Sequence, residues 1–283
     1  MNSETLTPAI SICMSTYNGA AYLAEQIESL LAQTCQDWTL WVRDDGSSDT
    51  TPDIVGRYAQ QYPHKIKVVR DARGRLGPSL SFGSLLETTD GEYFMFCDQD
   101  DVWLSNKIEL TLTVMKAAQA TYPHMPLLVH SDLKVVDHKL NPIADSFWNY
   151  QRLLPDIVSG YTGIVAENVV TGCTVMLNRA AKAVSVPIPP EAVMHDWWVA
   201  MNVAKHGKII TLPLSLTYYR QHENNRVGAS RTDFFRLLKK MKQASALIGR
   251  HYKMVKKYDP ELWYASILFR KLLLKLLQLT LKR

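Results

Sequence analysis

The chain has 283 residues, of which 47% are hydrophobic and 21% charged, so extensive disorder is excluded and one large domain with a helical appendage is possible. No run of 18 uncharged apolar residues occurs, which excludes a membrane-spanning helix, and the first residues lack the basic and apolar segments of a signal peptide. The four cysteines form no Cys-x-x-Cys, so we expect free thiols in a reducing compartment and a cytoplasmic protein.

The net charge of +5 averages two regions of opposite sign. From Arg231 to Arg283 there are 14 Lys and Arg against 3 Asp and Glu, a net charge of +11, which leaves −6 for residues 1–230. We therefore expect an acidic body over residues 1–230 and a basic helical extension over residues 231–283.

Strand and helix signals alternate through the first hundred residues. In chain order we expect a strand at 9–14, a helix at 20–33, a strand at 38–42, a helix at 52–62, a strand at 66–69, a helix at 78–87 and a strand at 93–97. This order predicts a doubly wound, parallel α/β sheet with right-handed crossovers.

The second half of the chain is less regular. We expect strands at 127–130, 175–177, 209–212 and 216–219, a helix at 197–205, and an irregular segment around 141–168. Beyond Arg231 the spacing of apolar residues is helical, with a break near Pro260.

Three carboxylates, Asp98, Asp100 and Asp101, directly follow the apolar run that ends at Cys97. They should open into the crevice at the carboxyl edge of the sheet, where such folds bind ligands. Neighbouring negative charges raise one another's pKa, and a divalent cation removes that cost. Mg²⁺ or Mn²⁺ held by one or two carboxylates usually completes its shell with water and substrate phosphates, so the cluster indicates a metal–diphosphate site. The alternative is a solvated acidic turn.

Two further polar loops end strands at the same edge, Ser15–Gly19 and Arg43–Asp49. The ring of Tyr17 can stack on a base, and the carboxylate of Asp45 can accept the imide N–H of uracil or thymine. The alternative is that these loops only cap helices and form turns, which stays open for Asn18.

The motifs that carry these loops resemble those of the inverting nucleotide-sugar glycosyltransferases of family 2. They are Ile10–Gly19, Trp41–Asp49 and Phe96–Trp103, and the later segments Val170–Cys173, His195–Trp198 and Tyr219–His222 are similar to those of bacterial rhamnosyltransferase-like members. The resemblance covers roughly residues 9–228. It implies the GT-A fold, a Rossmann-like, mostly parallel sheet, with a catalytic domain at 1–230 divided into a donor half at about 9–110 and an acceptor half at about 111–230.

The resemblance also implies roles for particular residues. Asp98 would contact the ribose, Asp100 would bind the metal, and His222 could complete the metal shell or bind a phosphate. The nucleotide-binding residues are expected to be Thr16, Tyr17, Asn18, Asp45, Arg75, Asp98 and Gln99. The acceptor-binding residues are expected to be Gly172, Cys173, Trp197 and Trp198. Alternatively, the tryptophans belong to the core, His222 is simply exposed, and the Arg73–Gly77 loop is a turn.

Asp196 matches the position of the family's catalytic base. In an inverting transfer the acceptor hydroxyl attacks the anomeric carbon opposite the leaving diphosphate, and a nearby carboxylate removes its proton. The alternative is that Asp196 caps a helix beginning at Trp197. Arg43 departs from many relatives, which have an aliphatic residue there; it could reach a phosphate or pair with Asp44.

The sequence thus predicts a metal-dependent glycosyltransferase, with L-rhamnose from dTDP-L-rhamnose as the preferred donor sugar and a lipopolysaccharide or other surface polysaccharide as acceptor. A UDP-hexose donor and a non-catalytic sugar-nucleotide-binding module remain alternatives. A nicotinamide-dependent oxidoreductase would need Gly-x-Gly-x-x-Gly after the first strand, where this chain has Thr16-Tyr17-Asn18-Gly19-Ala20-Ala21.

The basic extension contains apolar stripes interleaved with lysines and arginines, from Phe234 to Leu281. This pattern favours peripheral binding to the anionic inner face of the plasma membrane, next to a glycan or lipid-linked acceptor. The alternative is a helix packed on the catalytic domain. No motif of a known nucleic-acid reader accompanies the charge, so no nucleic-acid partner is expected.

Overall fold

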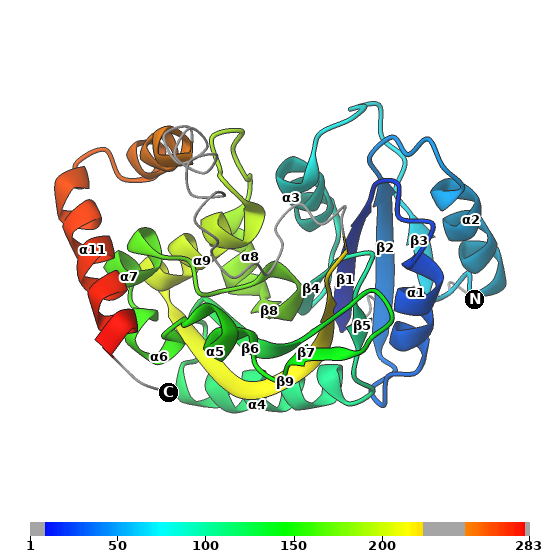
Figure 1. Cartoon of the computed structure of the whole chain (residues 1–283). Helices are drawn as coiled ribbons and strands as arrows, with labels where there is room; N and C mark the ends of the chain where they lie inside the picture. The colour runs from blue at the N-terminus through cyan, green and yellow to red at the C-terminus, as the bar shows by residue number, and fades with distance from the viewer. Residues whose placement is uncertain (1–8, 223–246, 281–283) are drawn as a thin grey trace.

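One curled, mixed sheet extends through the molecule in the computed structural model, which describes residues 9–222 and 247–280 (Figure 1). Its spatial order is β3-β2-β1-β4-β8-β6-β9-β5, with β7 paired to β6. The strands are β1 Ile10–Thr16, β2 Trp38–Asp44, β3 Ile66–Val68, β4 Tyr93–Cys97, β5 Val102–Trp103, β6 Leu127–Val136, β7 Pro142–Ala144, β8 Val175–Asn178 and β9 Lys208–Arg220.

The first four strands are parallel, as the alternating pattern predicts, but the sheet as a whole is not. β8 runs antiparallel between β4 and β6, while β6 and β9 are again parallel. The doubly wound parallel arrangement predicted for the first half of the chain is therefore confirmed, and the antiparallel pairs are confined to β5, β7 and β8. Four consecutive buried residues make up β8, and such a short run carries no signal of strand direction.

The helices cover the two faces of the sheet. They are α1 Leu23–Leu31, α2 Thr51–Gln61, α3 Pro78–Thr88, α4 Lys107–Thr121, α5 Phe147–Gln151, α6 Pro155–Val158, α7 Tyr161–Ala166, α8 Arg179–Ser185, α9 His195–His206, a helix over 247–258 and α11 Tyr264–Thr280. Alternate residues of β1 point to opposite faces, so Ile10, Ile12 and Met14 pack with α1, α2 and α4, whereas Cys13 joins α3 and α9.

Two elements of the second half differ from the sequence prediction. The strands expected at 209–212 and 216–219 form one long strand, because β9 continues through Pro213 with a shift of register against β6. Proline has no backbone N–H to give to the ladder, so the strand bulges there instead of ending. The sequence analysis also missed α4, whose β-branched residues Thr111, Thr113 and Val114 weaken a helical pattern.

The C-terminal helices pack against the second half of the chain, with α11 beside α7 (Figure 1). Met254, Val255 and Ile267 are buried in the same core cluster as Trp197 and Trp198 of α9. The opposite side of α11 is exposed and apolar; its large exposed residues are Leu268, Phe269, Leu272, Leu273, Leu276 and Leu279. The part of the predicted extension at 231–246, with its stripe around Phe234, lies outside the described residues, as do 281–283.

Candidate active site

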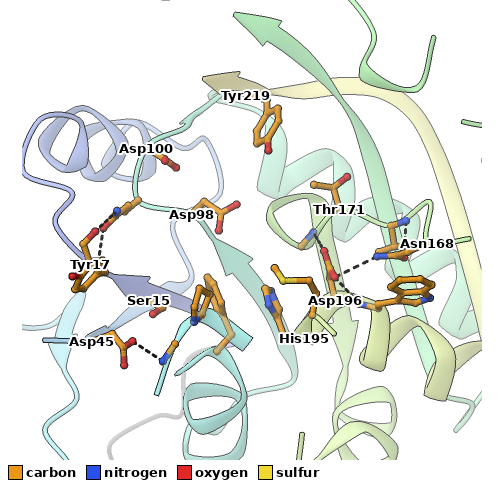
Figure 2. Close-up of a pocket in the computed structure, with 18 of the residues that line it drawn as sticks. Ser15, Tyr17, Asp45, Asp98, Asp100, Asn168, Thr171, His195, Asp196 and Tyr219 are labelled. Carbon is orange, nitrogen blue, oxygen red and sulfur yellow. Dashed lines mark hydrogen bonds between the residues drawn. The ribbon is translucent and has the colours of Figure 1, made fainter. Parts of the chain in front are cut away.

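A cavity of about 840 Å³ opens where β1, β2 and β4 end, and residues between 147 and 219 form its other wall (Figure 2). The three polar loops expected to share one edge therefore do meet. The residues lining the cavity are Ser15, Thr16, Tyr17, Asp45, Arg75, Leu76, Gly77, Pro78, Phe82, Asp98, Gln99, Asp100, Phe147, Gln151, Leu153, Asn168, Val170, Thr171, Gly172, Met194, His195, Asp196, Trp197 and Tyr219. Its size is within the range of small-molecule sites.

The loops after β1 and β4 are tied by two reciprocal hydrogen bonds between Tyr17 and Gln99. The Tyr17 N–H donates to Gln99 Oε1 at 2.9 Å, and Gln99 Nε2 donates to the Tyr17 carbonyl at 2.9 Å. Gly19 makes this possible, because a Cβ there would lie 2.2 Å from the Gln99 side chain. The guanidinium of Arg75 lies over the Tyr17 ring, 4.0 Å from its centre, so a positive charge covers one face of the ring.

Unlike Tyr17, Asn18 does not line the cavity. It adopts a left-handed backbone conformation with φ 47°, and its Oδ1 accepts the Ser48 N–H at 2.8 Å. Asn18 is absent from the cavity lining, so its expected contact with a nucleotide is not supported by the geometry. Asparagine suits a turn of this kind because it tolerates positive φ and bonds nearby backbone groups.

Asp45 is held in place by donors from β2 and from the loop that precedes α3. Its Oδ1 accepts from the Leu76 N–H at 2.7 Å and from Arg43 Nη1 at 2.6 Å, and its Oδ2 accepts from the Gly77 N–H at 2.7 Å. Arg43 is itself buried and also bonds Asp71, with Nε to Oδ2 at 2.9 Å. Arg43 therefore neither pairs with Asp44 nor lies free to reach a phosphate, and both sequence interpretations of it were wrong.

The carboxylates after β4 lie in two different settings. Asp101 is fully buried, and carboxylate oxygens of Asp98 and Asp101 and the Cys173 sulfur all lie within 4.8 Å of one another. Burial and the neighbouring carboxylates raise the pKa of both Asp98 and Asp101. The buried amine of Lys107 is adjacent: it donates to the Cys173 carbonyl at 2.5 Å and to Thr217 Oγ1 at 2.7 Å.

Asp100 faces the cavity and contacts His222. The Nε2 of His222 lies 2.9 Å from Asp100 Oδ2, so the sequence-predicted pair of metal-site residues is brought together from positions 122 residues apart. Arg220 supports this arrangement, because its Nε donates to the Asp100 carbonyl at 2.9 Å and its backbone N–H to Asp101 Oδ1 at 3.2 Å.

This donor set fits a divalent cation. Carboxylate oxygens are the ligands that Mg²⁺ and Mn²⁺ prefer, and the buried Asp101 Oδ2 has no hydrogen-bond partner among residues 9–222 and 247–280. Burial raises the pKa of the Cys173 thiol well above its usual value, so the sulfur stays protonated and is a poor ligand for a hard cation. The residues best placed to hold a cation and a diphosphate are therefore the oxygens of Asp98 and Asp100, with the His222 ring beside them.

Asp196 lies across the cavity from Asp98 and Asp100 (Figure 2). Its Oδ1 accepts from the Trp197 N–H at 2.6 Å and from Asn168 Nδ2 at 3.3 Å, while its Oδ2 accepts from the Gly172 N–H at 3.0 Å. Burial raises its pKa to about 6, and these hydrogen bonds oppose the rise. α9 begins at His195, so Asp196 lies in the first helical turn and the helix-cap alternative was wrong.

Of the four expected acceptor-binding residues, two line the cavity. Gly172 and Trp197 do so, and a Cβ on Gly172 would lie 2.7 Å from His195 Nε2. Cys173 points to the buried carboxylates, and Trp198 packs in the core with its indole N–H donated to the Ser185 carbonyl at 2.9 Å. An acceptor cannot reach either side chain in this structure, so the geometry corrects both assignments.

Several lining residues were not singled out from the sequence. His195 is the most unusual: it stacks on Phe82 with ring centres 4.2 Å apart, and neither of its buried ring nitrogens has a hydrogen-bond partner among the described residues. Burial lowers its pKa to about 3, so the ring is neutral. The signal for His195 was its place beside Asp196 in the His-Asp-Trp-Trp motif, whereas nothing in the irregular segment around Asn168 marked that residue.

The curled, mostly parallel α/β sheet with a cavity at its edge is the GT-A fold of glycosyltransferases. Residues 11–179 match the model of glycosyl transferase family 2, and the chain belongs to that family. An uncharacterized glycosyltransferase of Nostoc sp. is 30% identical over 229 residues, covering 78% of this chain and 67% of that protein. The dTDP-rhamnosyl transferase RfbG of Shigella flexneri is 27% identical over 226 residues, covering 77% of this chain and 74% of that protein.

Solved structures share the fold. TarS 1–349 of S. aureus, in complex with UDP-GlcNAc, aligns with a TM-score of 0.57 and 19% identity over 93% of this chain and 70% of that chain. The mannosyltransferase PcManGT of Pyrobaculum calidifontis, in complex with GDP-Man and Mn²⁺, aligns with a TM-score of 0.58 and 18% identity over 78% of this chain and 59% of that chain.

Two facts about extent accompany these matches. The chain spans 67, 52 and 62% of the length of three curated relatives, from Nostoc, Rickettsia typhi and Mycobacterium bovis. Within residues 9–222 and 247–280, none of the helices combines the length and the apolar character that crossing a membrane requires.

Proposed function

We propose that this glycosyltransferase moves a sugar from a nucleoside diphosphate donor with inversion, aided by a divalent cation. The observation that carries the proposal is the placement of Asp196 across one cavity from the Asp98–Asp100 cluster. An inverting displacement needs a base on the face opposite the leaving group, and one cavity supplies both sides.

In this proposal the donor half binds the nucleotide. The Tyr17 ring and the Arg75 guanidinium offer a stacking surface for the base, and Asp45 accepts a base N–H. Thr16 and Gln99 hold the loops around it: Thr16 Oγ1 donates to Asp44 Oδ1 at 2.9 Å, and Gln99 bonds the backbone of Tyr17. Asp98 lies beside the ribose.

The acceptor half supplies the base. Asp196, ionised above pH about 6, takes the proton of the acceptor hydroxyl as that oxygen attacks the anomeric carbon. Gly172 and Asn168 orient its two carboxylate oxygens, and Trp197 borders the acceptor. Asp100 and His222 would hold a divalent cation, which would supply positive charge to the leaving diphosphate.

The experiment that tests this reaction is donor binding and turnover of Asp100→Ala. The variant should lose metal-dependent nucleotide binding and transfer while keeping its thermal unfolding midpoint, because Asp100 is partly exposed and outside the core. Equal nucleotide affinity with and without a chelator in the unmodified protein would contradict the metal assignment. Nucleotide binding without any transfer would favour a non-catalytic sugar-nucleotide-binding module.

For the donor we propose dTDP-L-rhamnose and, as acceptor, a bacterial cell-surface polysaccharide or lipopolysaccharide. The support is the similarity to RfbG, whose name is dTDP-rhamnosyl transferase, at 27% identity. The second candidate is a UDP-hexose, since TarS with the same fold was solved with UDP-GlcNAc. Thermal shift with dTDP-rhamnose, UDP-hexoses and GDP-mannose, each with and without Mn²⁺, should single out one donor; a larger shift with a UDP-hexose would overturn the rhamnosyl proposal.

We also propose that the catalytic domain, residues 1–230, works at the inner face of the plasma membrane and that the extension 231–283 binds that surface. The support is the exposed apolar side of α11 together with the net charge of +11 over residues 231–283. The double variant Leu272→Ser, Leu279→Ser should bind anionic vesicles more weakly than the unmodified protein, and salt should weaken both. Point variants are preferable to a deletion, because α11 also buries Ile267. Equal binding to neutral vesicles would contradict the proposal.

A further inference from the structure

The segment from Ile164 to Asn168 lies between the C-terminal helices and Asp196. It consists of the end of α7 and the two residues that follow, and Figure 1 shows α11 beside α7 at the acceptor end of the molecule. Side chains from residues 247–280 form hydrogen bonds with this segment. Its last residue, Asn168, forms a hydrogen bond with the carboxylate of Asp196.

The first hold is at Glu167, whose side chain is almost fully buried. Its Oε1 accepts from Lys275 Nζ at 2.5 Å, and its Oε2 accepts from Gln278 Nε2 at 2.6 Å. Lys275 Nζ also donates to Gln278 Oε1 at 2.8 Å, so the three side chains form a closed ring of hydrogen bonds. α11 therefore fixes the residue immediately before Asn168.

The second hold is at His251, in the helix over 247–258. Its Nε2 lies 2.8 Å from the Val165 carbonyl, which only accepts, so this nitrogen carries the proton and Nδ1 accepts from the Tyr264 hydroxyl at 2.8 Å. The ring stacks on Trp197 with centres 4.6 Å apart, and the Trp197 indole N–H donates to the Ile164 carbonyl at 2.7 Å. Burial keeps the ring neutral by lowering the pKa of His251 to about 4.

The inner end of the segment is Asn168. Its Oδ1 accepts the Val170 N–H at 3.1 Å, which fixes the amide so that Nδ2 points to Asp196 Oδ1 at 3.3 Å (Figure 2). A displacement of Glu167 or Val165 would move Asn168, because Asn168 directly follows Glu167 and lies three residues after Val165. Catalytic groups are sensitive to such movement: a misplacement of about 1 Å can cost on the order of 10²-fold in rate.

We propose that the C-terminal helices position the catalytic base, with Glu167, Lys275 and His251 acting as positioning residues through Asn168 and Trp197. The inference rests on the proposed role of Asp196. It assigns the helices over 247–280 a part in turnover itself, separate from any contact with a membrane. The catalytic unit then extends beyond residue 230 and includes α11.

Lys275→Met is the most informative variant, because Lys275 is 51% exposed and its loss leaves no cavity in the core. Arg270→Met is the matched control: it removes a positive charge from an exposed residue of the same helix. Lys275→Met should lower kcat about tenfold with an unchanged donor KM. Lys275→Arg, which retains a donor for Glu167, should restore most of the rate.

The pH profile gives a readout that a merely structural contact would not move. The Asn168 bond favours the ionised form of Asp196, so loosening it should shift the acidic limb of kcat to higher pH in Lys275→Met and not in Arg270→Met. Equal kcat values and equal acidic limbs in these two variants would overturn the inference. A lowered unfolding midpoint with unchanged kcat and pH profile would also overturn it, because the contact would then only stabilise the fold.

Asp196→Asn, measured in parallel, separates the two proposals. If Asp196→Asn keeps most of its activity, the proposed base is wrong and the positioning inference fails with it. If Asp196→Asn loses turnover while Lys275→Met behaves like Arg270→Met, the proposed function stands and only the positioning role of the C-terminal helices is excluded.

Discussion

The two walls of the cavity, to which we assign the donor and the acceptor in our proposal, are built in different ways. On the donor side, Tyr17, Asp45 and Asp98 each follow the end of a parallel strand, and short loops lock them by reciprocal bonds such as Tyr17–Gln99. On the other wall, Asp196 is held by Asn168 and Gly172, which lie in the irregular connection between α7 and β8. The donor wall is thus fixed by the sheet itself, whereas the acceptor wall depends on elements packed around it.

This difference between the two walls predicts which kinetic parameter a substitution in each wall should change. A change in the donor wall should alter nucleotide affinity, because Tyr17, Asp45 and Asp98 are the side chains that we propose contact the nucleotide. A change in the acceptor wall should alter turnover, because the geometry of one carboxylate depends on several neighbours.

The largest expected effect is the contrast between Asp196→Asn and Asp45→Ala. Asp196→Asn should lower kcat on the order of 10²–10⁴-fold with donor KM nearly unchanged, because it removes only the base. Asp45→Ala should instead raise donor KM. Steady-state kinetics with the donor varied would test both. A collapse of donor affinity in Asp196→Asn would show that the two walls are not separate.

Arg43→Met should destabilise the donor half strongly. Asp45 and Asp71 would lose the guanidinium between them, and breaking a buried ion pair costs about 3–5 kcal/mol. Urea unfolding measures the change. Arg179→Met is the matched control, since the Arg179–Asp90 pair is exposed on both sides and should contribute little. Similar stability losses in the two variants would contradict the buried role of Arg43.

The pH dependence of turnover should report Asp196. With the pKa of Asp196 at about 6, kcat at saturating donor should fall about tenfold for each pH unit below 6. The reason is that a protonated carboxyl group cannot take the proton from the hydroxyl of the acceptor sugar. The small residual rate of Asp196→Asn should lack this limb. The same raised pKa means that Asp196 binds a proton more tightly in the folded state, so its contribution to stability declines as pH rises from about 4 to 6.

The smallest expected effect is that of Trp198→Phe. The variant loses the indole bond to the Ser185 carbonyl and should lower the free energy of unfolding by about 1 kcal/mol, with kcat and both KM values unchanged. Denaturant unfolding and kinetics on the same sample would test this. A rise in the acceptor KM alone would contradict this prediction and show that Trp198 contributes to acceptor binding.

The donor wall was predictable because its residues lie in contiguous motifs directly after strands, so their positions follow from sheet geometry. Asn18 shows the limit of that reasoning: it lies in the right motif, yet its side chain bonds Ser48. A motif fixes where the backbone goes and not which way each side chain points.

The acceptor wall was less predictable for the same physical reason. Cys173 and Trp198 neighbour Gly172 and Trp197 in the chain but point away from the cavity, because adjacent residues face different directions. Asn168 belongs to a segment without periodic pattern, and its position depends on tertiary contacts with α9 and α11 that no local signal encodes.

Arg220 has a consequence for how the chain folds. Its buried guanidinium contacts Glu25 of α1 and the carbonyls of Asp100 and His138, partners that precede it by 195, 120 and 82 residues. Contacts between residues so distant in sequence form late, because closing long loops is entropically unfavourable. A fragment limited to residues 11–179 would lack β9 and Arg220, and during synthesis the donor half must wait for residue 220 to leave the ribosome before its site is complete.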